Sequence, residues 1–525
     1  MTPIHTLGEL RASGYKVRSV KDEMRANLLA KIARRESVFP GVHGYERTVI
    51  PALHNAILSK HDIILLGLRG QAKTRILRSL TSLLDEQVPI IAGCEINDSP
   101  LQPSCKRCRR LAAEKNDDLP IAWIRREERY REKLATPDVT VADLVGDIDP
   151  IKAANQRLTY ADEEVIHYGI IPRTNRGIFA INELPDLAPR IQVALLNILE
   201  ERDLQIRGFP IRIPMDIVLV FSANPEDYTS RGNIITPLKD RIDSQILTHY
   251  PQTIETARHI TEQEAWIQRD GAVAVDIPLY VRDLVENIAF AARESELVDQ
   301  SSGVSARLTI AAIELLQSNL ERRAAITGDR LVFPRLSDLA MVLPAITGKV
   351  EMVYEGEQQG AEVVARKLIG TAVAKLFEQK FPPIERAGTR GNERRGYEAE
   401  DDLDDAFAGR RKQQAKKEPP REEKQRDKRQ EPNYETILGW FMEGNKITLS
   451  DEMPFAKHLA ELRRVPKLAD TAAKYVQSAR DEEQAFWMEM ILEGLHQALR
   501  LSREDLDSTI TFQELMKFNV LRTVK

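Results

Sequence analysis

A short apolar segment that runs directly into a glycine-containing loop constrains the fold of this 525-residue chain more than any other feature. Residues Asp62–Leu66 read Asp-Ile-Ile-Leu-Leu, which is the pattern of a buried parallel strand. The loop Gly67–Thr74, Gly-Leu-Arg-Gly-Gln-Ala-Lys-Thr, follows at once, and an amphipathic helix is expected after it. A strand, such a loop and a helix in this order predict a phosphate-binding loop.

The residues of this loop have distinct expected tasks. Its backbone N–H groups can surround phosphate oxygens, and the N-terminus of the following helix adds the positive end of its dipole. Lys73 is expected to reach the β- and γ-phosphates of a nucleotide, and Thr74 is expected to bind Mg²⁺. Ala72 stands where the motif has its second glycine, so its fit depends on the local backbone angles. The predicted nucleotide-binding residues of the loop are Gly67, Gly70, Gln71, Ala72, Lys73 and Thr74.

Two further apolar segments end in polar residues that could face the same nucleotide. The segment that begins at Arg176 ends in Asn182 and Glu183. Glu183 is expected to polarise the attacking water as a general base, and Asn182 to hold a Mg²⁺-bound water without adding negative charge. The segment Leu219–Asn224 also ends in an asparagine. We expect Asn224 to position the water and to sense the γ-phosphate.

Two arginines complete the predicted site. Arg241, within Leu238-Lys-Asp-Arg-Ile, is expected to reach the γ-phosphate bound by a neighbouring subunit and to stabilise the transition state with its fixed charge. Arg307 opens a predicted helix and is expected to fold over the nucleotide. The candidate catalytic residues are therefore Glu183, Asn224 and Arg241, and Asn182 and Arg307 join the nucleotide-binding residues.

The alternation of strands and helices predicts an α/β fold. Buried strands are expected at Val88–Ala92, Gly177–Ile181 and Ile217–Ser222, with helices between them such as Arg190–Glu201. This order implies a parallel sheet that is covered by helices on both faces. From Thr253 onward the pattern becomes helical, with Ile277–Glu294, Val304–Leu320 and Pro334–Thr347 as the clearest helices.

Changes in composition divide the chain into five expected parts. A strongly charged stretch with few apolar residues cannot bury enough surface to offset the entropy of ordering, so we expect it to be disordered. The parts are an N-terminal helical extension (1–37), an α/β nucleotide-binding domain (38–252), a helical lid domain (253–387), the charged disordered linker (388–431) and a separate C-terminal helical domain (432–525).

Composition excludes several classes of protein. Hydrophobic residues make up 42% and charged residues 30%, which is typical of a soluble protein with sizeable cores. A net charge of −5 gives no overall attraction to nucleic acid, and the basic run Arg410–Lys417 lacks aromatic residues that stack on bases. No apolar run is long enough to span a membrane, and the N-terminus has no secretory pattern. We therefore expect a cytoplasmic protein without membrane or nucleic-acid partners.

The ordered set of motifs resembles the AAA+ ATPases of the magnesium chelatase I-subunit and MoxR branch. The resemblance covers roughly residues 38 to 350 and includes Val42-His-Gly-Tyr-Glu, the loop Gly67–Thr74, Leu144–Asp149 and Gly169–Glu183. It implies a P-loop AAA+ core followed by a helical lid, with ATP and Mg²⁺ as cofactors. In this family's terms, the loop residues would form the Walker A motif. Asn182 and Glu183 would form the Walker B motif, and Asn224 would be sensor 1.

The resemblance also implies an assembly. Arg241 would be the arginine finger and Arg307 sensor 2, which implies a hexameric ring with ATP bound between subunits and a partner that carries a von Willebrand A domain. Asn182 departs from the family pattern, because an aspartate is usual there, so slow ATP hydrolysis is expected. The linker 388–431 and the C-terminal region have no counterpart in the compact chelatase subunit and argue against chlorophyll synthesis.

Three functions fit these motifs to different extents. The leading one is an ATP-driven motor that remodels a partner or assists metal insertion. An ATP-dependent transcriptional regulator is an alternative, but the chain lacks a Gly-Ala-Phe-Thr-Gly-Ala loop. Asn182 also suggests a nucleotide-switch scaffold that does not hydrolyse ATP.

Three cysteines form a second cluster in the sequence. Cys94, Cys105 and Cys108 have the spacing C-x10-C-x2-C, and the second pair has the spacing of ligands to one metal ion. Zinc is one interpretation, with His167 or water as a guess for the fourth ligand. Three reduced thiols without a metal and an iron–sulfur cluster are the alternatives. The cysteines do not form the pattern of a disulfide framework.

Overall fold

The computed structural model divides the chain into two compact units. The part of the chain that the structure describes comprises residues 4–156, 162–205, 212–225, 233–270, 273–384, 433–506 and 509–515. The first unit comprises Met1–Ala265, Ala292–Ile310 and Gly348–Gln358, and the second Trp266–Ala291, Ala311–Thr347 and Gln359–Lys525. The expected disordered linker 388–431 and the basic run Arg410–Lys417 lie outside the described residues.

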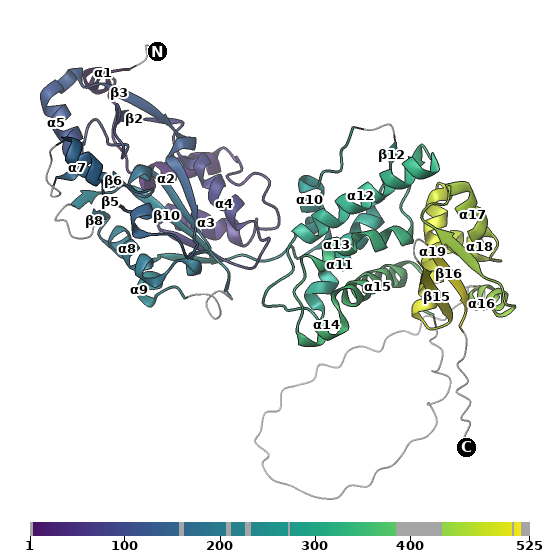
Figure 1. Ribbon diagram of the computed structural model, residues 1–525. Helices are drawn as coiled ribbons and strands as arrows, with labels where there is room; N and C mark the ends of the chain where they lie inside the picture. Colours follow the sequence, from purple (N-terminus) through teal and green to yellow (C-terminus); the bar gives the residue numbers. More distant parts are fainter. Residues whose placement is uncertain are drawn as a thin grey trace, which may run out of the picture. The chain divides into compact units, whose positions relative to one another are not determined.

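A five-stranded parallel sheet forms the centre of the first unit (Figure 1). Its order is β11–β1–β10–β7–β4, so the chain crosses from one strand to the next through helices. The strands are β1 (Ile63–Leu66), β4 (Tyr130–Leu134), β7 (Gly177–Asn182), β10 (Ile217–Ala223) and β11 (Ser244–Leu247). The predicted strands at positions 62–66, 177–181 and 217–222 are confirmed as β1, β7 and β10.

Helices cover both faces of this sheet, as predicted. Successive side chains of a strand point to opposite faces, so Ile63 and Leu65 pack into one core while Ile64 and Leu66 pack into the other. The first core includes α2 (Val20–Ala33), α3 (Val49–Leu58) and α4 (Lys73–Ser79), and the second includes α8 (Pro189–Glu200) and α9 (Thr236–Arg241). Burial on both sides explains why the central strands are almost wholly apolar.

The predicted parallel strand at Val88–Ala92 is wrong. Residues Gln87–Ile91 do form a strand, β2, but it pairs antiparallel with β3 (Ile121–Arg125) in a separate two-stranded sheet. The edge of the parallel sheet is occupied instead by β4, whose sequence Tyr-Arg-Glu-Lys-Leu is largely charged. An edge strand is exposed on one side and needs no continuous apolar run, which explains why the sequence pattern missed it.

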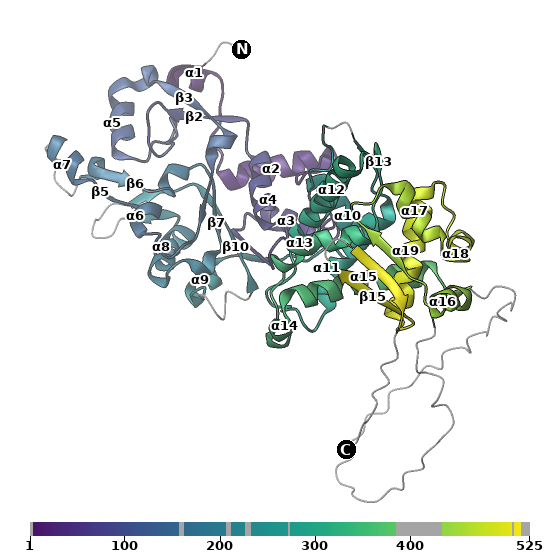
Figure 2. The same cartoon turned by 45° about the vertical axis from the view of Figure 1, so that its right-hand side comes forward.

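The connection between β2 and β3 carries α5 (Lys106–Lys115) (Figure 2). The same part of the first unit includes α1 (Leu7–Ala12), because Thr6 forms a bridge with Pro120 and Leu7 N–H donates to the carbonyl of Leu119. We name residues 87–125 the β2–β3 hairpin. It is inserted between the helix that follows β1 and the edge strand β4.

The N-terminal region 1–37, expected to be helical, contains α2, which is part of the core of the first unit. Ser19 caps its N-terminus by accepting a hydrogen bond from the N–H of Asp22. Within the helix Glu23 is buried and forms an ion pair with Arg129, with 2.7 Å between their charged atoms. Arg129 also donates to the carbonyl of Arg176, 2.7 Å away, at the start of β7. This pair therefore links α2 to the sheet.

Shorter elements complete the first unit. They are η1 (Leu80–Leu83), η2 (Asn116–Asp118), η3 (Arg126–Arg129), α6 (Val141–Leu144), β5 (Gly146–Ile148), α7 (Pro150–Gln156), η4 (Glu163–Val165), β6 (Ile166–Tyr168), η5 (Pro172–Thr174), η6 (Leu184–Asp186), β8 (Asp203–Gln205), β9 (Arg212–Pro214), α10 (Ile254–Glu264) and α14 (Tyr354–Gln359), whose last residue is assigned to the second unit. β5 pairs with β6 and β8 with β9, both antiparallel.

The helices predicted after position 253 are confirmed. They correspond to α11 (Leu279–Glu294), α12 (Arg307–Thr327) and the pair formed by η8 (Leu336–Val342) and α13 (Leu343–Thr347). The end of α11 and the start of α12 belong to the first unit, and the remainder of both helices belongs to the second. The other elements of this region are β12 (Ala274–Val275), β13 (Leu331–Val332) and α15 (Ala361–Lys380).

The C-terminal region contains the expected helices together with a sheet that was not expected. Its helices are α16 (Tyr434–Met442), α17 (Phe455–Arg463), α18 (Leu468–Tyr475) and α19 (Asp481–Gln497). A three-stranded antiparallel sheet of order β14–β16–β15 accompanies them, with β14 (Ile447–Ser450), β15 (Leu501–Leu506) and β16 (Thr509–Glu514). α19 packs against α15, so helices from both sides of 388–431 belong to one unit.

Among the described residues, no helix combines the length and the apolar character that a membrane crossing requires.

Candidate nucleotide-binding site

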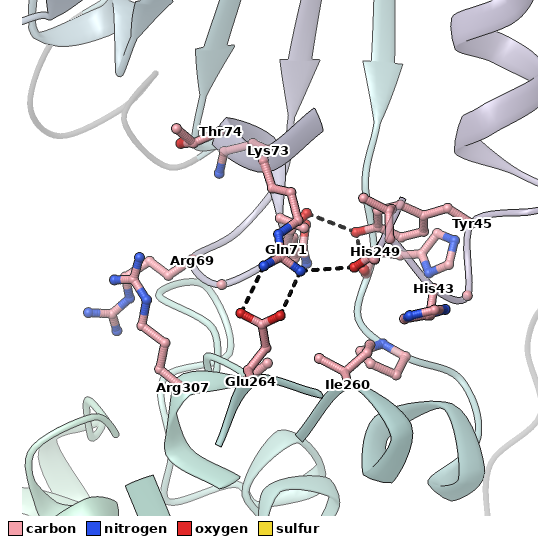
Figure 3. Close-up of a pocket in the computed structure, with 18 of the residues that line it drawn as sticks. His43, Tyr45, Arg69, Gln71, Lys73, Thr74, His249, Ile260, Glu264 and Arg307 are labelled. Atoms are coloured by element: carbon pink, nitrogen blue, oxygen red, sulfur yellow. Dashed lines mark hydrogen bonds and ion pairs between the residues drawn. The ribbon is translucent and has the colours of Figure 1, made fainter. Parts of the chain in front are cut away.

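A cavity of about 360 Å³ opens at the carboxyl end of the parallel sheet in the first unit (Figure 3). The loops that follow β1, β7 and β10 all reach it, as expected for ligand sites in open parallel sheets. α10 and the start of α12 provide the remaining wall. The residues that line it include Gly41–Tyr45, Arg69–Arg75, Glu183, Asn224, His249, Ile260, Glu264, Ala306, Arg307 and Ile310.

Two positions of the loop after β1 require glycine. A Cβ atom at Gly67 would overlap the hydroxyl of Thr248, which itself donates a hydrogen bond of 2.7 Å to the side chain of Gln71. Gly70 has a φ of +72°, and a Cβ atom there would overlap the hydroxyl of Ser305. The glycines of the motif therefore allow the loop to pack closely against its surroundings.

Ala72 adopts the left-handed conformation, with φ 57° and ψ 16°, directly before α4. For a residue with a Cβ atom this conformation costs roughly 1–2 kcal/mol. Alanine thus fits the place of the second motif glycine, but with backbone strain that a glycine would not have.

The side chain of Lys73 is almost completely buried and connects two of the loops at the cavity. Its ammonium group donates to the carbonyl of Leu68 at 3.1 Å and to Oδ1 of Asn224 at 2.6 Å, and it also contacts the carbonyl of Gly67. The lysine that follows β1 is therefore bonded to the asparagine that ends β10. Sequence order alone placed both residues at the same edge of the sheet, and the structure brings them into contact.

The polar pair at the end of β7 is divided between the cavity and the sheet. Glu183 lines the cavity, whereas Asn182 is buried behind it and accepts a hydrogen bond of 3.1 Å from the hydroxyl of Ser222. The backbone N–H of Glu183 donates to the same hydroxyl at 3.4 Å. Glu183 has φ 55° and ψ 50°, a left-handed conformation that is uncommon outside glycine and that concentrates at functional sites.

The two predicted arginines lie in different places. Arg307 is the first residue of α12 and lines the cavity beside the loop after β1. Arg241, at the end of α9, is not among the lining residues; its guanidinium binds Glu200 at 2.7 Å and the carbonyl of Pro237 at 3.0 Å. Arg241 therefore does not line the cavity of its own chain.

Ion pairs at the rim were not identified from the sequence. Arg75 pairs with Glu264 at 2.7 Å, and Figure 3 shows the Glu264 carboxylate joined to a guanidinium by two dashed lines. Arg69 pairs with Glu351 at 2.7 Å and donates to the carbonyl of Ser302 at 3.1 Å. Arg69 belongs to the loop Gly67–Thr74 and Arg75 to α4 directly after it, but no sequence pattern indicated their acidic partners.

Tyr45 was also missed as a site residue, although the segment Val42–Glu46 was part of the family pattern. Its hydroxyl lies 3.0 Å from the carbonyl oxygen of Gln71 and 2.8 Å from that of His249. Burial raises the pKa of Tyr45 to about 12, because the phenolate form would lose its hydration. The neutral hydroxyl therefore acts as a donor that holds the loop in place.

Comparison with known proteins finds relatives that are similar to part of this chain. The model of the AAA domain (dynein-related subfamily) matches residues 122–242, which include β4, β7 and β10. A magnesium-chelatase subunit ChlI homolog of Methanocaldococcus jannaschii is 25% identical over 232 residues, covering 43% of this chain and 59% of the relative. The ChlI subunit of Synechocystis is 27% identical over 222 residues, covering 40% and 58%.

The chain contains an AAA domain and is similar to the I subunits of magnesium chelatase. It spans 59% and 58% of the length of these two curated relatives. Among solved structures, a putative ATPase from Cytophaga hutchinsonii covers 70% of this chain and 98% of its own, with 16% identity and a TM-score of 0.29. A structure of the magnesium chelatase subunits BchI and BchD covers 65% and 97%, with 18% identity and a TM-score of 0.29.

The region of the AAA+ protein that the family model matches contains Asn182, Glu183 and Arg241. The loop Gly67–Thr74 precedes the matched range, and so do the three cysteines. The loop is attached to the matched region by the parallel pairing of β1 with β10.

The cysteine cluster of the AAA+ protein lies in the β2–β3 hairpin, away from the nucleotide cavity. Cys94, Cys105 and Cys108 lie together, and Asp98 joins them. His167, one guess for a fourth ligand, is exposed on β6, and its Nε2 atom is 3.5 Å from Arg173. Asp98 therefore replaces His167 as the residue beside the three sulfurs.

Proposed function

We propose that this AAA+ protein is an ATP-hydrolysing motor that uses Mg²⁺-ATP to remodel a partner. The observation that supports this most is a single cavity shared by Lys73, Thr74, Glu183 and Asn224. These residues come from the ends of three neighbouring strands and supply a cation, a hydroxyl, a carboxylate and an amide. Phosphoryl transfer to water needs this combination of charge stabilisation, metal binding and a positioned base.

Each residue has a proposed role. Lys73 and the backbone N–H groups of Gly70–Thr74 bind the phosphates, and the hydroxyl of Thr74 binds Mg²⁺. Glu183 accepts a proton from the attacking water, and Asn224 orients that water and contacts the γ-phosphate. Arg307 folds over the nucleotide from the start of α12. Mg²⁺ lowers the charge on the phosphates when it is bound.

We further propose that hydrolysis takes place between subunits of a ring, with six subunits as the expected number. Arg241 does not line the cavity of its own chain, and its pair with Glu200 lies at the surface with a side-chain exposure of 31% for Arg241. An arginine placed in this way can serve a neighbouring subunit. The proposed action is therefore a change of subunit contacts that follows hydrolysis.

A protein with a von Willebrand A domain is the proposed partner, and the proposed compartment is the cytoplasm. The relatives named magnesium-chelatase subunits support a metal-insertion task as one form of the remodelling. A gene for a von Willebrand A-domain protein beside this one would support the pairing. Co-purification of the two proteins only in the presence of ATP would test it directly.

A non-hydrolysing nucleotide switch is the second candidate, because Asn182 stands at the end of β7. Its amide is bonded to Ser222 and adds no negative charge near Mg²⁺. We propose slow turnover rather than none, because Glu183 still lines the cavity.

Single-turnover ATP hydrolysis separates the motor from the switch. The wild-type protein is expected to hydrolyse ATP, and Glu183→Gln is expected to bind ATP but to hydrolyse it about 10²–10⁴-fold more slowly, the usual value of a general base. Glu201→Gln is the matched control, because Glu201 is exposed at the end of α8. Absence of hydrolysis by the wild type would exclude the motor, and equal rates for Glu183→Gln and wild type would exclude Glu183 as the base.

A further inference from the structure

Three thiol groups and one carboxylate meet at one point of the β2–β3 hairpin. The sulfur atoms of Cys94, Cys105 and Cys108 and one oxygen of Asp98 all lie within 4.8 Å of one another. Cys105, Cys108 and Asp98 are buried, and Cys94 is partly exposed. These residues are separated by up to 14 positions in the chain, so the fold of the loop and of α5, rather than adjacency in sequence, brings them together.

The donors and their spacing fit one tetrahedral zinc ion. A Zn–S distance of about 2.3 Å in a tetrahedron separates two sulfurs by roughly 3.8 Å. Ligand atoms that already lie within 4.8 Å need to move by no more than about 1 Å to reach that geometry. Three thiolates are soft donors that disfavour Mg²⁺ and Ca²⁺, which take oxygen ligands. An iron–sulfur cluster ordinarily uses four cysteines, whereas the fourth group here is a carboxylate.

Backbone hydrogen bonds hold three of the four groups, Asp98, Cys94 and Cys105, in position. One oxygen of Asp98 accepts from the N–H groups of Ser104 at 2.8 Å and Cys105 at 2.9 Å. The sulfur of Cys105 accepts from the N–H of Cys108 at 3.3 Å, and the sulfur of Cys94 accepts from the N–H of Asp98 at 3.4 Å. Such outer bonds orient metal ligands and favour their charged forms. The three thiolates and the carboxylate are all negatively charged when they bind a metal.

We propose that Cys94, Asp98, Cys105 and Cys108 bind one structural Zn²⁺ ion. All four positions of the ion would be filled by the protein, which distinguishes a structural site from a catalytic site with an open position. The ion would fasten the loop after β2 to the first turn of α5 and so stabilise the hairpin. The site lies in a different part of the first unit from the nucleotide cavity, and none of its residues lines that cavity.

Metal analysis of the full-length protein, purified under reducing conditions without added metal, tests the proposal. The expected result is one zinc ion per chain, and three thiols that react with a thiol reagent only after a chelator removes the metal. Replacement of zinc by Co²⁺ is expected to give the absorption of thiolate-to-cobalt charge transfer with tetrahedral coordination. These readouts do not depend on ATP hydrolysis, so a failure here leaves the proposed function untouched.

Variants identify the ligands. Cys108→Ser is expected to lose the ion, and Asp98→Asn to weaken it by at least about tenfold, the loss that even an outer-shell partner of a metal ligand produces. Asp118→Asn is the matched control, because Asp118 is exposed in the same hairpin. Circular dichroism shows whether each variant folds. Zinc-free wild type that does not take up Co²⁺, iron in place of zinc, or an Asp98→Asn variant with wild-type affinity would each overturn the proposal.

Discussion

Ala72 and Glu183, two residues beside the nucleotide cavity, have left-handed backbone conformations that glycine adopts more readily. At Ala72 the conformation aims the loop into α4, and at Glu183 it turns the chain out of β7 so that the carboxylate reaches the cavity while Asn182 stays behind. Each of these conformations costs roughly 1–2 kcal/mol, and the packing of the surrounding residues holds the backbone in it. Single residues therefore set the direction of the loop into α4 and of the Glu183 carboxylate.

Asn182→Asp is expected to increase ATP turnover and to lower the Mg²⁺ concentration that gives half-maximal activity. Aspartate has nearly the shape of asparagine and can still accept the hydrogen bond from Ser222, but it adds a negative charge near the metal. Steady-state hydrolysis across a range of Mg²⁺ concentrations measures both effects. Asn197→Asp, the same change at an exposed position of α8, is expected to have no effect. An unchanged or higher Mg²⁺ requirement in Asn182→Asp would contradict the role given to this residue.

Because of Tyr45, the folded protein is expected to lose stability at high pH. Its pKa is raised from 10 to about 12 by burial, so the folded protein keeps the proton that the unfolded chain releases. This contribution is complete below pH 10 and is lost as the pH rises from 10 through 12, by up to roughly 2–3 kcal/mol. Urea unfolding at about pH 9 and about pH 11 is expected to show a smaller decrease for Tyr45→Phe than for wild type. Tyr354→Phe is the control, because Tyr354 is exposed by 69% and should leave the decrease unchanged.

Some of the secondary-structure elements can be recognised from their sequences, and others cannot. The central strands β1, β7 and β10 are buried on both faces, so each is a continuous apolar run that could be recognised. The edge strand β4 could not, because its exposed side chains are charged. β2 was placed in the wrong sheet, since an apolar run does not show which strand it will pair with.

The polar groups of the site were predictable for the same reason. Lys73, Glu183 and Asn224 follow the recognisable strands directly, so their meeting at one sheet edge follows from parallel pairing. The contacts of Tyr45 and Arg69 depend on how separate loops pack, which no local pattern encodes. Asp98 was missed beside the cysteines because aspartate is common in loops and only the folded hairpin places it there.

The buried ion pair between Glu23 of α2 and Arg129 of η3 is expected to contribute most to the attachment of that helix. Glu23→Gln leaves the guanidinium of Arg129 buried without a counter-charge, which destabilises by about 3–5 kcal/mol. Asp117→Asn breaks the pair with Arg11, whose side chains are 55% and 67% exposed, and is expected to cost less than about 1 kcal/mol. Urea denaturation measures both. Similar costs for the two variants would show that burial of the Glu23 pair does not matter.

At the scale of the whole molecule, the division into two compact units separates the nucleotide cavity from most of the helical region. The cavity, including Glu264 and Arg307, belongs to the first unit. α11 and α12 each contribute residues to both units, so each helix continues from one unit into the other. The residues that line the cavity nevertheless all come from one compact unit.

Mixing of two inactive variants tests the proposed ring. Arg241→Ala lacks the arginine that is proposed to act on the neighbouring subunit, but it keeps Glu183, the proposed base. Glu183→Gln keeps Arg241 but lacks the base. Each variant alone is expected to be inactive, and a mixture is expected to regain part of the activity, because some interfaces combine an intact base with an intact arginine. Hydrolysis measured against mixing ratio gives the result. A mixture that stays inactive although the two variants assemble together would show that Arg241 does not act between subunits.

On the proposed function, the bond between Lys73 and Asn224 gives the protein a means to distinguish ATP from ADP. A phosphate group that binds the Lys73 ammonium breaks the hydrogen bond between Lys73 and Asn224. The side-chain amide of Asn224 is then able to turn toward a water molecule. A nucleotide whose phosphate chain is too short to reach Lys73 leaves the amide of Asn224 bonded to the lysine. We expect the tip of β10 to report the length of the phosphate chain, so that the empty and the post-hydrolysis protein share one resting arrangement.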